Sequence, residues 1–304
     1  MSKVDKNNKK DNKEKDFAHA VISWYPGHMA KTKKQIAEDL KLVDVVIEIL
    51  DSRIPLSSQN PDIAKVIQGK KKIVILNKCD ISDENQNKQW VKYFEDKGIP
   101  AVLTDSNSGK GIEECIRKIE NVMKEELDKK ASKGRIGSKI KAMIIGIPNV
   151  GKSSFINRIA KKNSANVGNK PGVTKTKQWI RINEKIELLD TPGVLWPKFE
   201  DQSAAIRLAF TGAISDDILD IETLAMKLLS YLAESYPQSL TERYKIEFTS
   251  EDDGLALLEK VGKKRGMVIS GGEINTVRAA ITVLDEFRSG KLGRITLEMP
   301  PEKE

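Results

Sequence analysis

The segment from Gly146 to Ser153, GIPNVGKS, fits the phosphate-loop pattern G-x-x-x-x-G-K-[ST]. In this pattern, Gly151 lets backbone N–H groups curl around phosphates, Lys152 supplies a positive charge, and the Ser153 hydroxyl completes a Mg²⁺ shell. A glycine-rich turn that merely joins a strand to a helix does not explain why Lys and Ser follow the glycine. The motif therefore predicts a site for a nucleoside triphosphate with Mg²⁺. Its predicted nucleotide-binding residues are Asn149, Val150, Gly151, Lys152, Ser153 and Ser154.

A second motif, DTPG at 190–193, extends the predicted phosphate site. Asp190 would hold the magnesium through water, and the Gly193 N–H could donate to the γ-phosphate. Thr174, in the PGVT segment between the two motifs, offers a second hydroxyl to the metal. D-x-x-G is weak alone, but after a phosphate loop it becomes specific. The predicted magnesium ligands are Ser153, Thr174 and, through water, Asp190.

The base is indicated by the sequence NKCD at 77–80. A carboxylate at Asp80 can accept both N1–H and the exocyclic N2–H of guanine, a donor pair that adenine lacks, so an ATP-using enzyme is disfavoured. The alternative for these residues alone is a polar helix cap after a buried strand. SNSG at 106–109 is a weaker signal, similar to the loop whose N–H groups contact guanine O6. The predicted base-side residues are Asn77, Lys78, Cys79, Asp80, Asp105, Ser106 and Asn107.

Short β-branched runs alternate with amphipathic stretches from residue 43 onward, which is typical of βαβ units and a mainly parallel sheet with flanking helices. Each motif follows a run that reads as a strand. We therefore expect an α/β fold in which the motifs share one edge of the sheet. The predicted strands are 43–50, 72–76, 100–104, 142–147 and the pair 176–182 and 184–189, and the predicted helices include 112–123 and 153–160.

The pattern changes near residue 200, where β-branched runs give way to helical periodicity. We expect a disordered basic tail over 1–16, an α/β domain over 17–200 and a smaller all-helical domain over 205–304. The apolar residues expected to face the helical core are Ile218, Ile221, Leu224, Ala225, Leu228 and Leu232 in one helix and Ile274, Val277, Ile281, Leu284 and Phe287 in another.

Composition limits the classes of protein. The 304 residues hold 52 Lys and Arg against 44 Asp and Glu, a formal charge of +8 that favours polyanionic partners, although a salt-laced surface explains it equally well. The two cysteines, Cys79 and Cys115, cannot form a disulfide framework or a four-ligand zinc site. No apolar run is long enough to cross a bilayer and the N-terminus has no hydrophobic export segment, so we expect a cytoplasmic protein with no membrane and no disulfide partner.

The motifs occur in an unusual order. NKCD and SNSG precede the phosphate loop and DTPG, the reverse of ordinary small GTPases, which indicates a circularly permuted GTPase domain. Together with WYPGHMAKT at 24–32 and DSRIPLSS at 51–58, these motifs resemble the ribosome biogenesis GTPase A family, the YlqF/RbgA type, over about residues 17–304. The resemblance implies a GTPase of late large (50S) ribosomal subunit assembly that binds GTP and GDP, with a helical domain that contacts rRNA of the subunit precursor.

The resemblance also suggests the catalytic group. Val194 follows Gly193 where many GTPases have a Gln that orients the attacking water, and its side chain cannot hydrogen-bond water. The family assigns this role to the His of its W-[FY]-P-G-H-M-A-K element, which is His28 here. A neutral imidazole can orient or deprotonate water near pH 7. We expect slow intrinsic hydrolysis that the ribosomal particle activates by ordering this distant segment; a plain surface or cap role for His28 is the alternative.

Two further predictions leave alternatives open. Asn149 either helps to hold a K⁺ ion beside the phosphates or is chosen for its turn geometry. Cationic side chains of the helical domain either bind rRNA phosphates or form a solvated face. An RNA-binding module with little catalytic turnover is the alternative function. The predicted RNA-binding residues are Lys263, Lys264, Arg265, Arg278, Arg288 and Lys291.

Overall fold

A computed structural model describes residues 29–135, 137–163, 179–189 and 201–301. His28, Thr174, Asp190 and Gly193 lie outside these described residues, as does the N-terminal tail. The chain divides into two compact units: one holds Gly27–Trp196 together with Thr296–Glu304, and the other holds Pro197–Ile295.

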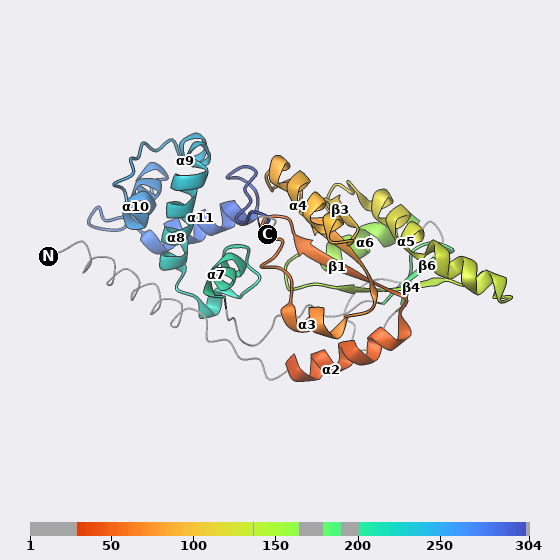
Figure 1. The fold of residues 1–304 in the computed structure, drawn as a ribbon. Coiled ribbons are helices and arrows are strands. Elements are labelled where there is room, and N and C mark those ends of the chain that lie inside the picture. Colours follow the sequence, from red (N-terminus) through yellow and green to blue (C-terminus); the bar gives the residue numbers. More distant parts are fainter. Residues whose placement is uncertain (1–28, 136, 164–178, 190–200, 302–304) are drawn as a thin grey trace. The chain divides into compact units, whose positions relative to one another are not determined.

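The first unit is built on a six-stranded sheet in the order β3-β2-β1-β4-β6-β5 (Figure 1). All neighbouring pairs are parallel except β5 and β6, which are antiparallel. The predicted mainly parallel sheet is confirmed. The strands are β1 (Val45–Asp51), β2 (Lys71–Asn77), β3 (Ala101–Thr104), β4 (Ile140–Ile145), β5 (Trp179–Arg181) and β6 (Ile186–Leu189).

Helices pack on this sheet through its β-branched and leucine side chains. Ile36 and Leu40 pack in one cluster with Val46 and Met143. A second cluster places Trp90 and Phe94 of the helix after β2 against Leu50, Val74 and Leu76 of the strands. The helices of this unit are α2 (Met29–Asp39), the 3-10 helix η1 (Leu40–Leu42), α3 (Pro61–Val66), α4 (Glu84–Asp96), α5 (Ile112–Ser132) and α6 (Lys152–Asn163).

The strand order gathers the sequence motifs at one edge. The chain runs β1, β2, β3 in one direction across the sheet and then returns to place β4 on the other side of β1. In register, Asp51 lies opposite Asn77, and Asn77 lies opposite Thr104, so these strands end together. NKCD follows β2, SNSG follows β3 and the phosphate loop follows β4. The motifs therefore surround the point where the winding direction changes, the usual ligand position in such sheets.

The second unit is helical throughout its described regular elements, as predicted. Its last helix differs from the expected apolar face, because Val277 and Ile281 are 50% and 49% exposed while Ala279 and Ala280 are buried. The two alanines allow close packing: a Cβ on Gly262 of the preceding helix would lie 3.6 Å from the Cβ of Ala279. Ile218 is also exposed, because it lies in a 3-10 turn before its helix. The elements are α7 (Gln202–Phe210), η2 (Asp216–Ile218), α8 (Ile221–Ser235), α9 (Pro237–Tyr244), α10 (Gly254–Lys264) and α11 (Thr276–Arg288).

The C-terminal segment, residues 296–301, corrects the expected end of the helical domain. Instead of staying with the helices up to residue 304, the chain from Thr296 onward belongs to the sheet-containing unit. The Leu297 N–H donates to the Arg53 carbonyl at 2.8 Å, and Trp90 Nε1 donates to the Glu298 carbonyl at 3.2 Å. These hydrogen bonds satisfy polar groups that would otherwise be buried without a partner. Among the helices in the described residues, none is long and apolar enough to span a membrane.

Candidate nucleotide site

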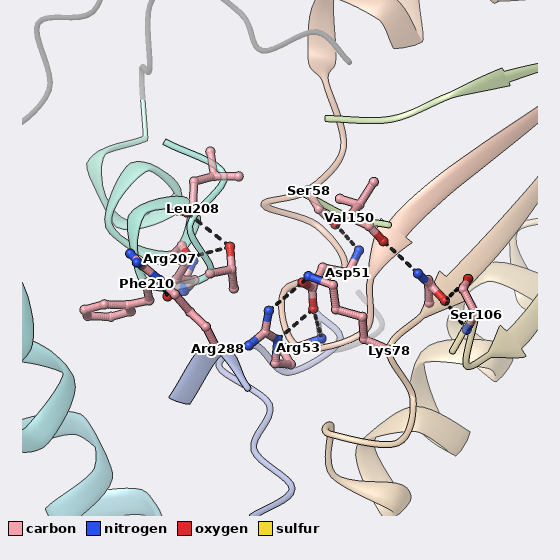
Figure 2. Close-up of polar contacts among 12 residues, drawn as sticks. Asp51, Arg53, Ser58, Lys78, Ser106, Val150, Arg207, Leu208, Phe210 and Arg288 are labelled. Atoms are coloured by element: carbon pink, nitrogen blue, oxygen red, sulfur yellow. Dashed lines mark hydrogen bonds and ion pairs between the residues drawn. The ribbon is translucent and has the colours of Figure 1, made fainter. Parts of the chain in front are cut away.

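Asn77, the last residue of β2, joins three of the predicted motif loops. Its Nδ2 donates to the Val150 carbonyl of the phosphate loop at 2.8 Å. Its Oδ1 accepts from the Ser106 hydroxyl at 2.8 Å and from the Ser106 N–H at 3.2 Å, and Figure 2 shows Val150 and Ser106 on either side of this amide. The Asn77 side chain is buried. NKCD, SNSG and the phosphate loop are thus held within hydrogen-bond distance of one another.

The phosphate loop has the backbone that its sequence requires. Asn149 and Gly151 adopt positive φ angles of 61° and 94°, a region that glycine and asparagine tolerate best. A Cβ on Gly151 would lie 2.4 Å from Asn77 Nδ2, so glycine is needed for space as well. Lys152 Nζ donates to the carbonyls of Gly146 and Ile147, both at 2.8 Å. A phosphate oxygen would compete well for this ammonium group, because charge-assisted hydrogen bonds are the stronger ones.

The residues after the loop suit a phosphate with its magnesium. Helix α6 begins at Lys152, so its N-terminal N–H groups and the positive end of its dipole face the loop. Ser153 lies exposed in the first turn, and its hydroxyl is a hard oxygen ligand of the kind Mg²⁺ prefers. Met143 of β4 lies opposite Leu189, the last residue of β6, which directly precedes Asp190 in sequence. Within the described residues, no cluster of His, Cys, Asp and Glu could hold a metal by itself.

The base-side loops are shaped by their own polar groups. The Cys79 N–H donates to the Thr104 carbonyl at 3.1 Å, and the Ile81 N–H donates to the Lys78 carbonyl at 3.1 Å, which closes a turn around the half-buried Asp80. The Asp105 carboxylate accepts from the N–H groups of Asn107 at 2.8 Å and Ser108 at 3.2 Å. Asp105 therefore shapes the SNSG loop, a role that the sequence prediction did not give it.

Asp51 and Arg53 were quoted in the sequence only as part of DSRIPLSS, yet the structure joins them to NKCD. Asp51 Oδ1 accepts from Arg53 Nε at 2.9 Å, and Oδ2 accepts from the Arg53 guanidinium and from Lys78 Nζ, both at 2.8 Å (Figure 2). Burial alone would raise the pKa of Asp51, but the charges and hydrogen bonds of Arg53 and Lys78 outweigh it, so its pKa lies well below the usual range. A carboxylate at the end of a buried strand was the available sequence signal.

The cations predicted to bind RNA divide into two groups. Arg288 donates to the Phe210 carbonyl at 3.1 Å (Figure 2) and to the Ala209 carbonyl at 2.9 Å, which satisfies the C-terminal end of α7. It also pairs with Asp216 at 2.7 Å. Arg265 lies 3.1 Å from the Glu286 carboxylate. These two arginines stabilise the helical unit. The remaining predicted cations, Lys263, Lys264, Arg278 and Lys291, are exposed.

The chain is similar to known proteins over nearly its whole length. Residues 141–249 match the family model described as 50S ribosome-binding GTPase. Ribosome biogenesis GTPase A of Bacillus cereus is 48% identical over 282 residues, which cover 93% of this chain and 95% of that protein. The mitochondrial ribosome-associated GTPase 1 of Ictalurus punctatus is 35% identical, with 93% of this chain and 94% of that protein covered.

Solved structures show the same likeness. A GDP-bound structure of TM YlqF has a TM-score of 0.67 at 25% identity and covers 88% of this chain and 99% of that one. A GNP-bound YlqF from T. maritima has a TM-score of 0.62 at 26% identity and covers 90% of this chain and all of the other. The chain belongs to the ribosome biogenesis GTPase A family, as a GTPase that binds and hydrolyses GTP in ribosome biogenesis.

Proposed function

We propose that this GTPase acts in the cytoplasm on the precursor of the large (50S) ribosomal subunit, late in its maturation, and that the particle accelerates its GTP hydrolysis. The observation that best supports a single nucleotide site is the pair of contacts made by the Asn77 side chain, which holds the phosphate loop and the SNSG loop beside NKCD. The formal charge of +8 and the 50S-binding description of the matched family support a polyanionic ribosomal partner.

Within the site, we propose that guanine lies against Asp80 and that the phosphates lie over the loop from Gly146 to Ser153. The change Asp80→Asn should then weaken GDP binding and favour xanthosine diphosphate, whose base offers a carbonyl where guanine has an amino group. Asp83→Asn is the matched control, because Asp83 caps α4 by accepting from the Gln86 N–H at 2.9 Å. An Asp80→Asn variant that kept the preference of the control for GDP would contradict this placement.

We propose that Ser153 and Thr174 hold Mg²⁺ directly and that Asp190 holds it through water. When bound, this ion would neutralise charge that develops on the phosphates. His28 would orient or deprotonate the attacking water, since Val194 cannot. The GTPase rate of His28→Ala, measured with and without precursor particles, tests the assignment: we expect the particle-stimulated rate to fall by about two orders of magnitude, in the range of general base catalysis. A stimulated rate near that of wild type would contradict it.

The K⁺ proposal for Asn149 can be separated from turn geometry. Because Asn149 has a φ of 61°, its backbone conformation alone accounts for asparagine. Asn149→Gly keeps this conformation available and removes only the amide. If Asn149 helps to hold K⁺, the wild type should turn over faster in K⁺ than in Na⁺, and the glycine variant should lose this difference while keeping its affinity for GDP. Equal wild-type turnover in both salts would remove the K⁺ proposal.

We propose that rRNA contacts the exposed cations of the helical unit, Lys263, Lys264, Arg278 and Lys291. Neutralised phosphates release counterions, so binding should weaken steeply with salt. The double change Lys263→Glu and Lys264→Glu should reduce both the affinity for rRNA and this salt dependence. The control is Lys88→Glu with Lys92→Glu on α4, which changes the net charge equally. Similar rRNA binding by both double variants would rule out this surface.

Sedimentation with large-subunit precursors tests the partner and the switch together. The protein should sediment with the particle under a non-hydrolysable GTP analogue and less so under GDP, because a nucleotide can shift affinity only through a difference between its two states. Equal sedimentation in both nucleotides would exclude a GTP-controlled association. Absence of sedimentation in either would exclude the proposed partner.

A further inference from the structure

Asp51, a buried carboxylate beside the base-recognition motif, contacts two cationic side chains, although one would balance its charge. The side chains of Asp51 and Arg53 are 2% and 1% exposed, and the guanidinium bonds both carboxylate oxygens. Lys78 Nζ approaches Oδ2 as a second cation, also at 2.8 Å. The Lys78 side chain is 22% exposed, so its ammonium group could be hydrated instead. The pair with Arg53 already neutralises Asp51, so the contact with Lys78 requires another explanation.

Lys78 occupies a demanding backbone position. Its φ of 62° lies in the left-handed region, which is unfavourable for a residue with a Cβ. The turn that Lys78 opens contains Asp80 and closes with the bond from the Ile81 N–H to the Lys78 carbonyl. Rotation at Lys78 would therefore move the Asp80 carboxylate relative to Asn77, whose amide is fixed on the phosphate loop.

The anchor for Lys78 is itself rigid. Asp51 ends β1 opposite Asn77 in the sheet register, and its N–H donates to the Ser58 hydroxyl at 3.2 Å. The Arg53 N–H and side chain both bond Asp51 Oδ1. A buried ion pair often adds little to the free energy of folding. We therefore expect the pair of Asp51 with Lys78 to act mainly by fixing the position of Lys78.

We propose that Asp51 is a positioning residue for guanine recognition. The Asp51 carboxylate binds Lys78 Nζ and so holds Lys78 in its left-handed backbone conformation. This conformation orients the turn that contains Asp80, so that the Asp80 carboxylate accepts from both N1–H and N2–H of the base. This inference rests on the proposed placement of guanine at Asp80. It predicts an effect on discrimination between bases, which loss of stability alone would not produce.

The readout is the ratio of the dissociation constants of inosine diphosphate and GDP, because inosine lacks the N2 amino group. We expect Asp51→Asn to lower this ratio at least fivefold. Lys78→Met tests the same contact without disturbing the pair of Asp51 with Arg53 and should lower the ratio similarly. The double variant should lower it no further than the stronger single change, because both remove one interaction. Thermal unfolding of each variant shows that the folded protein is being measured.

Lys72→Met is the matched control. Lys72 lies in β2, the strand that leads into Lys78, and pairs at 3.0 Å with Glu48, another buried carboxylate of β1, but at the opposite end of β2 from NKCD. It should lower the unfolding temperature and leave the ratio unchanged. If Asp80→Asn shifts preference to xanthosine diphosphate while Asp51→Asn and Lys78→Met keep the wild-type ratio, the positioning role is wrong. If Asp80→Asn shows no shift, the placement of the base fails, and this inference fails with it.

Discussion

The Glu298 side chain adds to the hydrogen bonds that hold the C-terminal segment on the sheet-containing unit. Its carboxylate accepts from the N–H groups of Leu56 at 2.8 Å and Ser57 at 3.0 Å, and the Ser57 hydroxyl also bonds it. Glu298 is buried, with 8% of its surface exposed. Removal of the acceptor leaves these donors without a partner, and each such buried group costs about 1–3 kcal/mol. We therefore expect Glu298→Ala to lower the free energy of unfolding of this unit by about 3 kcal/mol.

Thermal unfolding followed by tryptophan fluorescence measures this effect, because the buried Trp90 donates to the Glu298 carbonyl. For a unit of this size, 1 kcal/mol corresponds to about 2–4 °C, so the midpoint should fall by about 6–12 °C. Glu298→Gln keeps an oxygen acceptor but loses its charge, and it should give about half of this shift.

Glu125→Ala is the control, since Glu125 is exposed on α5 and its replacement should change stability by less than about 0.5 kcal/mol. A Glu298→Ala midpoint within the range of the control would refute the reasoning. The result would mean that water replaces the carboxylate at no cost and that the segment lies on the unit without stabilising it.

Three other experiments test separate parts of the structure. Gly151→Ala should weaken GDP binding by about 100-fold through the clash with Asn77, whereas Gly98→Ala, with a φ of +71° but nothing within 4 Å, should lose only stability. The Cys115 thiol, whose pKa burial raises to about 12, should resist a thiol reagent at pH 8 until the protein unfolds; rapid labelling of the native protein would contradict this. Because the folded-state pKa of Asp51 is depressed, its contribution to stability is complete above its unfolded pKa of about 3.9 and is lost as the pH falls toward the folded value. The difference in unfolding free energy between wild type and Asp51→Asn should therefore be smaller at pH 3 than at pH 6, and an equal difference would count against the ion-pair account.

The sheet and the motif loops could be predicted because their signals are local. The run Val45–Asp51 is rich in β-branched and other apolar residues, so it predicts a buried strand without knowledge of its neighbours, and the structure buries it at every position. The phosphate loop carries its own turn chemistry in Gly151 and Asn149, and the observed φ angles agree with it. Local patterns of this kind specify an element and its chemistry together.

The features that were missed depend on partners distant in sequence. Glu298 contacts Ser57 across 241 positions, and nothing in its neighbourhood distinguishes it from an exposed acid. In α11, the buried side follows Ala279 and Ala280 rather than the larger Val277 and Ile281, because small residues allow the neighbouring helix to approach closely. A search for apolar periodicity assigns the most apolar residues to the buried face of a helix. In α11 the close approach of the neighbouring helix instead requires small residues on that face.

The inverted order of the motifs has no effect on the site because the site belongs to an edge of the sheet. β1 lies between β2 and β4, so the bond from Asn77 to Val150 crosses over the end of β1, where Asp51 is placed by register. Cutting and rejoining the chain elsewhere changes which loop comes first but not which strand ends are neighbours. DSRIPLSS, which has no nucleotide chemistry of its own, begins at Asp51, the last residue of β1, and so lies at the strand end between the base motif and the phosphate loop. A residue there can influence both loops, which is why a change at Asp51 is expected to alter base discrimination and not stability alone.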